Sequence, residues 1–245
     1  MNFERIVLQV ADSTNKVVHE MYMNNVVRKP VCVTAAFQTA GKGLEQNMWF
    51  SSDGKNLLLS LGFKPDFLRP EEQFELTKIV SLALLETVGQ FLENEKLFIK
   101  WPNDIYCRDQ KIAGILISNL IQGREIELTI VGIGLNINEQ NFPQSIPNPV
   151  SMIQLLGEVV KVEDVLDVFL VVFASKINEF RFSREKIHED YLANLLYYNE
   201  KRNYLVSKDQ ISGTITGVNA YGHLRLKTDD GDVMEFDLKE IVFIH

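Results

Sequence analysis

The sequence predicts an α+β fold with a large N-terminal domain followed by a small all-β domain. Strand-like runs separated by short turns follow one another over residues 97–135, as in an antiparallel meander. The strongest helical periodicity, over residues 70–93, lies outside this meander. Antiparallel strands with helices elsewhere in the chain are typical of α+β architecture, and 245 residues are enough for one large and one small domain.

Short apolar runs in the first third of the chain predict strands, and one polar cluster predicts the start of a helix. The side chains of Asp12, Ser13, Thr14 and Asn15 can cap a helix over residues 16–23. Strands are expected over residues 6–10, 31–37 and 56–61, with a flexible loop over residues 38–47.

Two helical regions are marked by their first residues. Pro70 and the acidic residues after it fit the first turn of a helix that continues to about residue 93. Ser151 and Gln154 have the spacing of a capping box, which predicts the first of two or three helices that extend to about residue 198. The meander between these regions is expected to comprise strands over residues 97–100, 111–120 and 125–135.

The character of the sequence changes near residue 200. From Tyr204 onward, short strand-like runs alternate with turn signals such as Asp230-Gly231. We therefore place a domain boundary there, and we expect a large domain over residues 1–200 and a small β-barrel over residues 201–245. Because the first predicted strand begins at Ile6, we expect no helix-turn-helix domain before it.

The composition excludes several classes of protein. With 46% hydrophobic and 24% charged residues the chain is neither disordered nor fibrous. Its net charge of -8 argues against a dedicated nucleic-acid-binding protein, which needs clustered positive charge. Cys32 and Cys107 are isolated and the four histidines lack metal-ligand spacing, so we expect a reducing compartment and no zinc. Without a signal-peptide pattern or an apolar run of about 18 residues, the protein is expected to be cytoplasmic.

A glycine-rich segment with one cation, Gly41-Lys42-Gly43, is the first candidate for ligand binding. Glycines let backbone N–H groups approach a ligand and the lysine adds positive charge, which suits a phosphate or a carboxylate. An ordinary surface loop explains the same residues equally well. The segment is no P-loop, because the pattern Gly-x-x-x-x-Gly-Lys-Ser/Thr is absent.

The second candidate is the stretch over residues 100–116. Pro102 fixes a turn at a strand end where Asp104 presents a carboxylate, and Gly114 lets a ligand lie against the backbone of a strand. An Asx turn, a β-bulge at Gly114 and a solvated Lys111 are the structural alternatives, and each of them is favoured when its residue is considered alone.

A third glycine-containing segment surrounds Gly132 and Gly134. It resembles a dinucleotide-binding fingerprint only in part, since the third glycine is missing and a proline-rich loop follows in place of a helix. We therefore reject a Rossmann site and expect a strand end with a buried Asn136. Trp49 fits either stacking on a flat ring or packing in the core.

Taken in order, these motifs resemble those of the biotin protein ligases, and the resemblance covers nearly the whole chain. The C-terminal part, with Gly213, Gly217 and Gly222, takes part in it. The matching segments are Asp12-Ser-Thr-Asn15, Gln38-Thr-Ala-Gly-Lys-Gly43 leading to Trp49, Lys100-Trp-Pro-Asn-Asp104, Lys111-Ile-Ala-Gly114 and Gly132-Ile-Gly-Leu-Asn136. Several motifs in one order are far more specific than any one of them.

The resemblance implies a monofunctional ligase with a catalytic domain around a mixed β-sheet and a C-terminal SH3-like β-barrel. Such a ligase uses ATP and Mg²⁺ to convert biotin into biotinyl-5′-AMP and pyrophosphate. A lysine of a biotin carboxyl carrier protein or domain then attacks the mixed anhydride and releases AMP. The resemblance implies neither DNA nor a membrane as a partner, and it leaves the choice between a monomer and a homodimer open.

The resemblance also assigns roles to individual residues. Ser13, Thr14 and Gln38 are expected to bind the neutral ureido head of biotin, and Asp104 to hold Mg²⁺ or to orient the incoming lysine. The full implied biotin-binding set is Ser13, Thr14, Asn15, Gln38, Gly41, Lys111 and Gly114, where Gly114 leaves room for biotin. The implied ATP- and adenylate-binding set is Lys42, Gly43, Trp49, Lys111 and Asn136, and the implied catalytic set is Lys42, Lys111 and Asp104.

The glycine segment departs from the family pattern. Many members carry several arginines there, whereas this chain reads Gly41-Lys-Gly-Leu-Glu-Gln-Asn-Met-Trp49, with one cation and an added carboxylate. Because lysine cannot clamp a phosphate with two parallel hydrogen bonds, we expect faster release of biotinyl-AMP than in arginine-rich relatives. Two alternatives remain open: a lipoate or octanoate ligase or transferase, and a non-catalytic biotin- or nucleotide-binding module.

Overall fold

The structure is a computed structural model that describes residues 1–26, 29–44 and 47–244. Its larger sheet contains β1 (Glu4–Ala11), β2 (Val31–Gln38), β3 (Leu57–Phe63), β4 (Leu97–Lys100), β5 (Asp104–Cys107), β6 (Gln110–Gln122) and β7 (Glu125–Leu135). The strand order is β1-β2-β3-β7-β6-β5-β4. β1 and β2 are parallel and the other neighbouring pairs are antiparallel, which confirms a mixed sheet within an α+β fold.

The meander has one strand more than the sequence predicts. Residues 104–107, which the sequence analysis assigns to no strand, form β5, which pairs with both β4 and β6. The strand escapes periodicity analysis because it is only four residues long, and because Pro102 and Arg108, which has φ 56°, mark turns on both sides of it. The extra strand places Asp104 opposite Gly114 in the sheet.

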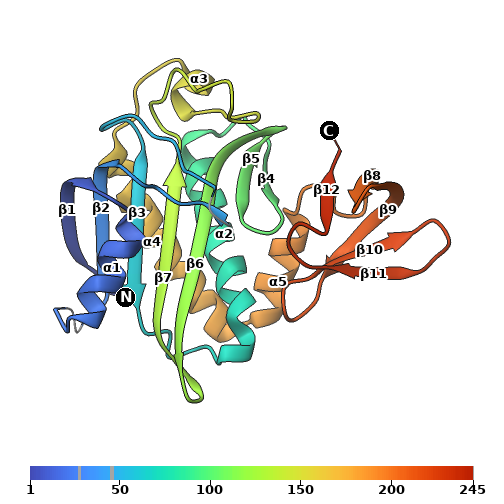
Figure 1. Ribbon diagram of the computed structural model, residues 1–245, viewed down its shortest axis with the longest axis horizontal. Helices are drawn as coiled ribbons and strands as arrows, with labels where there is room; N and C mark the ends of the chain where they lie inside the picture. The colour runs from blue at the N-terminus through green and yellow to red at the C-terminus, as the bar shows by residue number, and fades with distance from the viewer. Residues whose placement is uncertain (27–28, 45–46, 245) are drawn as a thin grey trace.

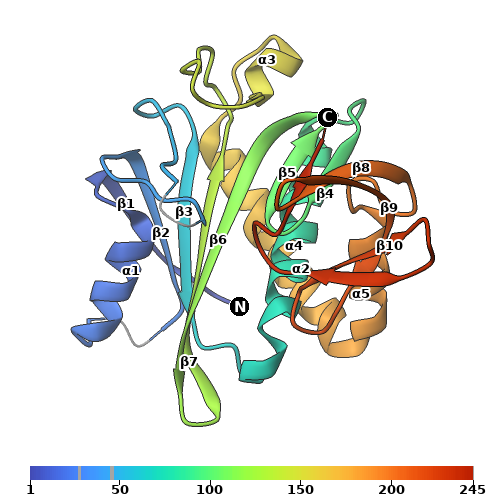
Figure 2. The same cartoon turned by 45° about the vertical axis from the view of Figure 1, so that its right-hand side comes forward.

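Helices cover the two faces of the sheet unequally. They are α1 (Thr14–Met23), α2 (Gln73–Phe91), α3 (Met152–Leu156), α4 (Val162–Phe182) and α5 (Arg184–Ala193). α2 and α4 cover one face, whereas α1 lies on the other together with the connection from β2 to β3 (Figures 1 and 2). None of the described helices has the length and apolar character needed to cross a bilayer.

Alternation along β3 and β7 explains why the faces differ. In β3, Leu57, Leu59 and Leu61 point into the main core beneath α2 and α4, whereas Ser60 points to the face of α1. In β7, alternate residues from Val131 to Leu135 enter the same core, so Gly132 and Gly134 share the face of α1. The sheet is thus apolar over the whole face beneath α2 and α4, whereas the face of α1 combines a smaller apolar cluster around Val18, Val33 and Ile130 with the small residues Ser60, Gly132 and Gly134.

The start of α1 differs from the expected cap. The helix begins at Thr14, two residues earlier than predicted, and the side chain of Ser13 at the N-cap makes no capping hydrogen bond. The backbone N–H of Thr14 instead donates to Gln38 Oε1 at 2.7 Å. A cap supplied from a distant strand leaves no pattern near the helix start, which is why the sequence did not predict it.

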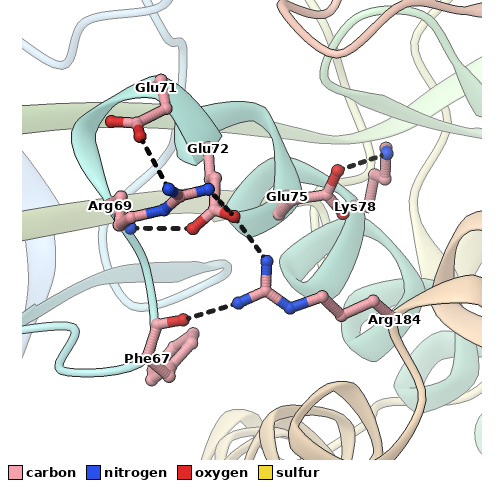
Figure 3. Close-up of polar contacts among 7 residues, drawn as sticks. All are labelled: Phe67, Arg69, Glu71, Glu72, Glu75, Lys78 and Arg184. Atoms are coloured by element: carbon pink, nitrogen blue, oxygen red, sulfur yellow. Dashed lines mark hydrogen bonds and ion pairs between the residues drawn. The ribbon is translucent and has the colours of Figure 1, made fainter.

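α2 is attached to the rest of the molecule at its first turn. Residues Pro70–Glu72 form a 3₁₀ turn before the α-helix, so the predicted helix is confirmed apart from its first turn. The carboxylate of Glu72 accepts hydrogen bonds from the Arg69 side chain at 3.0 Å and from Arg184 of α5 at 2.6 Å, as Figure 3 shows. The capping box at Ser151 and Gln154 is also confirmed, and three helices follow it in the chain.

The C-terminal unit is a five-stranded antiparallel sheet. Its strands are β8 (Lys201–Val206), β9 (Asp209–Val218), β10 (Leu224–Thr228), β11 (Val233–Phe236) and β12 (Ile241–Phe243), in the order β11-β10-β9-β8-β12. An all-β unit is therefore confirmed, but the expected closed barrel is not: between residues 201 and 244 no ladder joins β11 to β12. Its buried residues belong to the same apolar cluster as the core beneath the large sheet.

Candidate active site

A cavity of about 500 Å³ lies on the face of the large sheet that carries α1. Its walls come from the start of α1, the connection from β2 to β3, strands β4 to β7, and the C-terminal segment over residues 238–243. It gathers most of the residues that the sequence nominated: Ser13, Thr14, Asn15, Gln38, Lys42, Gly43, Trp49, Asp104, Lys111 and Gly114. Their roles in ligand binding stay predictions at this point.

One end of the cavity is a network of hydroxyl and amide groups. Thr14 Oγ1 lies 3.1 Å from Gln38 Oε1, to which it donates, and the fully buried Ser60 Oγ lies 2.6 Å from Thr14 Oγ1. Ser60 Oγ also lies within hydrogen-bond distance of Asn15 Oδ1, and Asn15 Nδ2 donates to the backbone of Leu116 at 3.3 Å. Ser60 has a single proton, so it donates to one of these oxygens at a time. The network carries no charge and suits a neutral polar ligand.

The floor of the cavity is made of strand backbone. Gly114 of β6 pairs with Gly134 of β7, and the Trp49 ring lies on both: a Cβ added at Gly134 would be 2.3 Å from Trp49 Cε2. The space above Gly114, which the family resemblance assigns to biotin, is therefore occupied by Trp49 in this structure. A Cβ at Gly132 would likewise overlap Asn15 at 2.2 Å. Both positions therefore require glycine because the side chains of Asn15 and Trp49 lie against the strand, and this requirement produces the partial likeness to a dinucleotide-binding fingerprint.

The connection that carries Trp49 is ordered as a hairpin. The backbone N–H of Trp49 donates to Gly41 O at 2.9 Å, and the backbone N–H of Gly43 donates to Asn47 O at 2.7 Å. Lys42 and Met48 form an antiparallel β-bridge. We call the described residues of this segment, 41–44 and 47–49, the Trp49 hairpin. The expectation of a flexible loop is thus wrong for the described part of it, while Glu45 and Gln46, where the segment departs from the family pattern, lie outside the described residues. Gly43 N–H is already used within the hairpin and does not point to a ligand.

The other end of the cavity is positively charged. Lys111 Nζ lies 2.7 Å from Asp104 Oδ1 and 5.7 Å from the centre of the Trp49 ring. Among the described residues that line the cavity there are four lysines, Lys42, Lys100, Lys111 and Lys239, against the single carboxylate of Asp104. In a protein of net charge -8 this local excess of cations favours an anionic ligand.

Lys100 and the C-terminal segment are part of the cavity that the sequence analysis missed. Lys100 Nζ donates to Tyr106 Oη at 3.1 Å and lies 5.4 Å from the ring centre of Phe243. Burial lowers the pKa of the Lys100 ammonium, the carboxylate of Asp104 raises it, and the charge of Lys111 lowers it further. Its position in the motif Lys100-Trp-Pro-Asn-Asp104 was the available signal, whereas no local pattern places β12 beside it.

Two predicted site residues lie outside the cavity lining. Asn136 is buried, its Nδ2 donates to Val150 O at 3.1 Å, and its backbone N–H donates to Ile112 O at 2.9 Å. In this structure its amide therefore holds the segment before α3, and its contact with a nucleotide stays a prediction. Gly41 is buried against Trp49 and Gln38, where a Cβ would be 2.9 Å from Trp49 O, so it shapes the hairpin instead of wrapping a ligand.

The donor set does not form a resident metal site. Within residues 1–26, 29–44 and 47–244 no three His, Cys, Asp or Glu side chains gather as metal ligands. Asp104 is the acidic residue of the described cavity lining, and its carboxylate is held by Lys111. A Mg²⁺ ion is usually held by one or two carboxylates together with substrate phosphates, so this chain fits Mg²⁺ that arrives with a nucleotide better than Mg²⁺ held alone.

Comparison with known proteins agrees with the motifs and with the fold. The family model described as "Biotin/lipoate A/B protein ligase family" matches residues 7–136. The chain belongs to this family. The match runs from the middle of β1 to the end of β7 and includes all the cavity residues before the C-terminal segment.

Relatives of the family are similar over most of the chain. The bifunctional ligase/repressor BirA of Bacillus subtilis is 28% identical over 228 residues, which cover 91% of this chain and 69% of that protein. The chloroplastic biotin–protein ligase 1 of Arabidopsis thaliana is 26% identical over 231 residues, or 89% of this chain and 61% of that protein. The structure of the Aquifex aeolicus biotin protein ligase in complex with biotin and ATP has a TM-score of 0.81 at 24% identity, covering 98% of this chain and 97% of that one. The last comparison extends the likeness of fold to the C-terminal unit.

Proposed function

We propose that the protein is an ATP-dependent biotin ligase. It activates biotin as biotinyl-5′-AMP and transfers the biotinyl group to a lysine of a biotin carboxyl carrier protein or domain. The relatives named above are biotin ligases, and the chain belongs to their family. The observation that carries the proposal is the division of one cavity into an uncharged hydrogen-bonding end and a lysine-rich end.

The uncharged end fits the ureido head of biotin. A urea has N–H donors and a carbonyl acceptor but no charge, and the side chains of Thr14, Asn15 and Gln38, which line the cavity, offer both kinds of group. Ser13 is nine-tenths buried at the same end of the cavity and adds a hydroxyl. An ionised side chain in this place would have no charged partner when a neutral ligand is bound, and this would lower the affinity for the ligand.

The lysine-rich end fits the reacting groups. Attack of the biotin carboxylate on the α-phosphate of ATP forms one C–O–P link and expels pyrophosphate, so two anions approach each other and charge grows on the phosphate oxygens. Lys111 and Lys42 line this end of the cavity and are placed to stabilise that charge. We propose that ATP enters as its Mg²⁺ complex and that Trp49 lies beside the adenine ring.

Asp104 is assigned to the second step. The attacking amine of the carrier lysine must lose a proton, and a carboxylate at the cavity wall can orient the amine or accept that proton. Its ion pair with Lys111, at 2.7 Å, holds the carboxylate next to the proposed site of the anhydride. A contact with Mg²⁺ in the first step is the other role open to Asp104.

The organisation of the chain around this activity is also a proposal. We assign residues 1–200 to the catalytic domain and residues 201–245 to a C-terminal domain that supplies β12 to the cavity wall. A cytoplasmic site of action fits the two free cysteines. Neither DNA nor a membrane is required for the proposed reaction.

The test is biotin-dependent exchange of labelled pyrophosphate into ATP, which isolates the first step from the carrier protein. We expect exchange with biotin and none with lipoate or octanoate. Exchange with lipoate or octanoate but not with biotin would show that one of these acids is the substrate, since the family includes lipoate ligases. Absence of exchange with all three acids, together with retained binding of biotin or ATP, would favour a non-catalytic binding module.

A further inference from the structure

A buried polar cluster lies beside the cavity but does not line it. Five buried polar residues gather where β7 ends and β3 begins: Ser51, Asn56, Asn136, Glu139 and Ser151. Asn56 Oδ1 accepts the backbone N–H of Ile137 at 2.9 Å, and Asn56 Nδ2 donates to Ser51 Oγ at 3.1 Å. The cluster therefore joins the segment after the Trp49 hairpin to the segment after β7.

Glu139 is the charged member of this cluster. Its side chain is 1% exposed, and its Oε2 accepts hydrogen bonds from the backbone N–H of Ser52 at 2.9 Å and from Asn56 Nδ2 at 3.3 Å. Lys55 Nζ lies 3.6 Å from Oε1. Burial acts to raise the pKa of the Glu139 carboxyl, but the Ser52, Lys55 and Asn56 contacts together hold it below its ordinary value. The carboxylate is thus buried and ionised.

A buried carboxylate is a costly way to gain stability, because its desolvation costs several kcal/mol. The side chain of its partner Lys55 is 41% exposed, so the ion pair offsets only part of that cost. What the carboxylate provides here is a fixed position for the groups that donate to it. Glu139 itself is held by its own backbone, because Ser151 Oγ donates to Glu139 O.

The partner held most directly is the end of the Trp49 hairpin. Ser52 follows Trp49 by three residues in the sequence, and its N–H is the donor to Glu139. The hairpin's other end is fixed differently, by backbone bonds from Thr39 to Ala11 and from Ala40 to Asp12, both at 2.9 Å. The hairpin therefore has a backbone anchor before Gly41 and a side-chain anchor after Trp49.

We propose that Glu139 is a positioning residue for the reaction: its carboxylate fixes the end of the Trp49 hairpin and thereby holds Lys42 and Trp49 over the cavity. The proposal rests on the proposed ligase function for its catalytic consequence, but its structural consequence does not depend on that function. Without the carboxylate, the segment after Trp49 keeps the hydrogen bond from Asn56 Nδ2 to Ser51 Oγ and the backbone bond from Gly54 to Ala36 but loses the bond from Ser52. The two cavity residues of the hairpin then move more freely above the glycine floor.

The test is the Glu139→Gln variant of the full chain, followed by hydrogen exchange with mass spectrometry and by pyrophosphate exchange. Gln has nearly the same shape but places an amide NH₂ where one of the donors now binds. We expect the amides of Gly43 and Trp49 to exchange roughly tenfold faster, the factor that about 1.4 kcal/mol provides, while β3 and β7 exchange as before. We also expect KM for ATP to rise about tenfold with a smaller change in kcat.

Glu125→Gln is the matched control, because Glu125 lies at the far end of β7 and pairs with Lys64 at 2.8 Å on the surface. It should leave both readouts unchanged. If Glu139→Gln does not fold, Lys55→Met, which removes the cation beside the carboxylate, should give a smaller change in the same direction. The proposal is overturned if the hairpin amides of a folded Glu139→Gln variant exchange hydrogen at the wild-type rate, whether or not the melting temperature changes. The ligase function is refuted if the wild-type protein shows no biotin-dependent pyrophosphate exchange. In that case the hydrogen exchange result still decides whether Glu139 positions the hairpin.

Discussion

The proposed reaction assigns Lys111 to its first step and Asp104 to its second, although the two side chains form one ion pair. The ammonium and the carboxylate are 2.7 Å apart and partly exposed to the cavity. Each neutralises the other until a ligand arrives, so neither is left unpaired in the free protein. An anion that enters the cavity can share the ammonium and loosen the pair, which leaves the carboxylate available for an incoming amine.

Removal of the Lys111 cation is expected to slow activation of biotin. We expect Lys111→Ala to lose about 2–4 kcal/mol of transition-state stabilisation in pyrophosphate exchange, because charge grows on the phosphate oxygens in that step. Lys64→Ala, which removes a lysine at the surface that pairs with Glu125 and Glu127, is the control and should retain activity. Activity of Lys111→Ala within twofold of wild type would show that another group stabilises the charge.

The single cation of the Trp49 hairpin is expected to affect retention of the intermediate. Leu44 lines the cavity, in a segment where arginine-rich relatives carry more positive charge. We expect Leu44→Arg to lengthen the half-life of enzyme-bound biotinyl-AMP several-fold, because a guanidinium can bind the phosphate through two hydrogen bonds. Release is measured by rapid filtration after single-turnover activation. The isosteric and uncharged Leu44→Met serves as control, and equal half-lives for Leu44→Arg and wild type would contradict the expected role of charge.

At the scale of elements, β7 and the Trp49 hairpin are adjusted to each other. The missing side chain of Gly134 is the space that the Trp49 ring fills. We expect Gly134→Ala to displace the ring, because a Cβ there would be 2.3 Å from Trp49 Cε2. The measurement is acrylamide quenching of tryptophan fluorescence, to which Trp101, 5% exposed, contributes little.

The control for this substitution is Gly89→Ala in α2, where a Cβ meets only Leu97 at 3.7 Å. It should leave quenching unchanged and increase helix stability slightly. If Gly134→Ala and wild type are quenched equally, the ring does not depend on the glycine floor for its position.

The junction between α2 and α5 makes stability depend on acidic pH. Hydrogen bonds from the Arg69 side chain, opposed by burial and supported by Arg184, lower the pKa of Glu72 to about 2. A lowered folded-state pKa contributes stability that is complete above the ordinary value near 4.5 and is lost as the pH falls toward 2. Figure 3 shows that the same carboxylate joins both arginines.

We therefore expect Glu72→Gln to lower the free energy of unfolding by about 1–2 kcal/mol at neutral pH and to differ less from wild type as the pH falls through this range. Urea unfolding at a series of pH values from neutral to acidic measures both effects. Glu71→Gln, which removes an exposed carboxylate 3.2 Å from the same arginine, is the control and should change little. A pH-independent difference for Glu72→Gln would contradict the assignment.

Elements with strong local patterns were predictable from the sequence, whereas elements defined by distant partners were not. Apolar periodicity and Pro70 predicted α2 almost to its ends, and the capping box predicted α3. β5 was missed because four residues between turn signals carry no periodicity. The cap of α1 by Gln38 and the seating of Trp49 on Gly134 depend on residues far apart in the chain, so no local pattern indicates them.

The candidate site was predictable to the extent that its residues occur in motifs. Lys111 and Asp104 were nominated from motifs and lie 2.7 Å apart. Asn136 was nominated in the same way, yet its amide is used inside the protein. Phe243 and its neighbours could not be nominated, because their place at the cavity depends on how the C-terminal unit packs against the large sheet.

At the scale of the whole molecule, the C-terminal unit shares its apolar core with the larger unit, and Gly222 is one of the points where the two meet closely. Trp101 Nε1 donates to Gly222 O at 2.8 Å, and the backbone of Gly222 lies against the ring of Phe74 in α2. Phe74 in turn packs edge-to-face with Tyr191 of α5. Because Trp101 and the C-terminal segment both line the cavity, we expect the contact at Gly222 to contribute to the shape of the site.

We expect Gly222→Ala to separate the two units locally and to destabilise the protein. A Cβ at this position would be 2.3 Å from Phe74 Cδ2, and the residue has φ +93°. Gly231→Ala is a matched control, since Gly231 has φ +92° with no atom within 4 Å of the added carbon. The control variant has the backbone strain without the steric contact. We expect Gly222→Ala to lose about 1–3 kcal/mol more of the free energy of unfolding than Gly231→Ala, and this difference measures the contact with Phe74. Thermal unfolding of the two variants, with pyrophosphate exchange at a temperature where both are folded, provides the comparison. Equal melting temperatures would mean that Phe74 moves aside at little cost, whereas a larger loss of both stability and exchange in Gly222→Ala would show that packing of the C-terminal unit shapes the cavity.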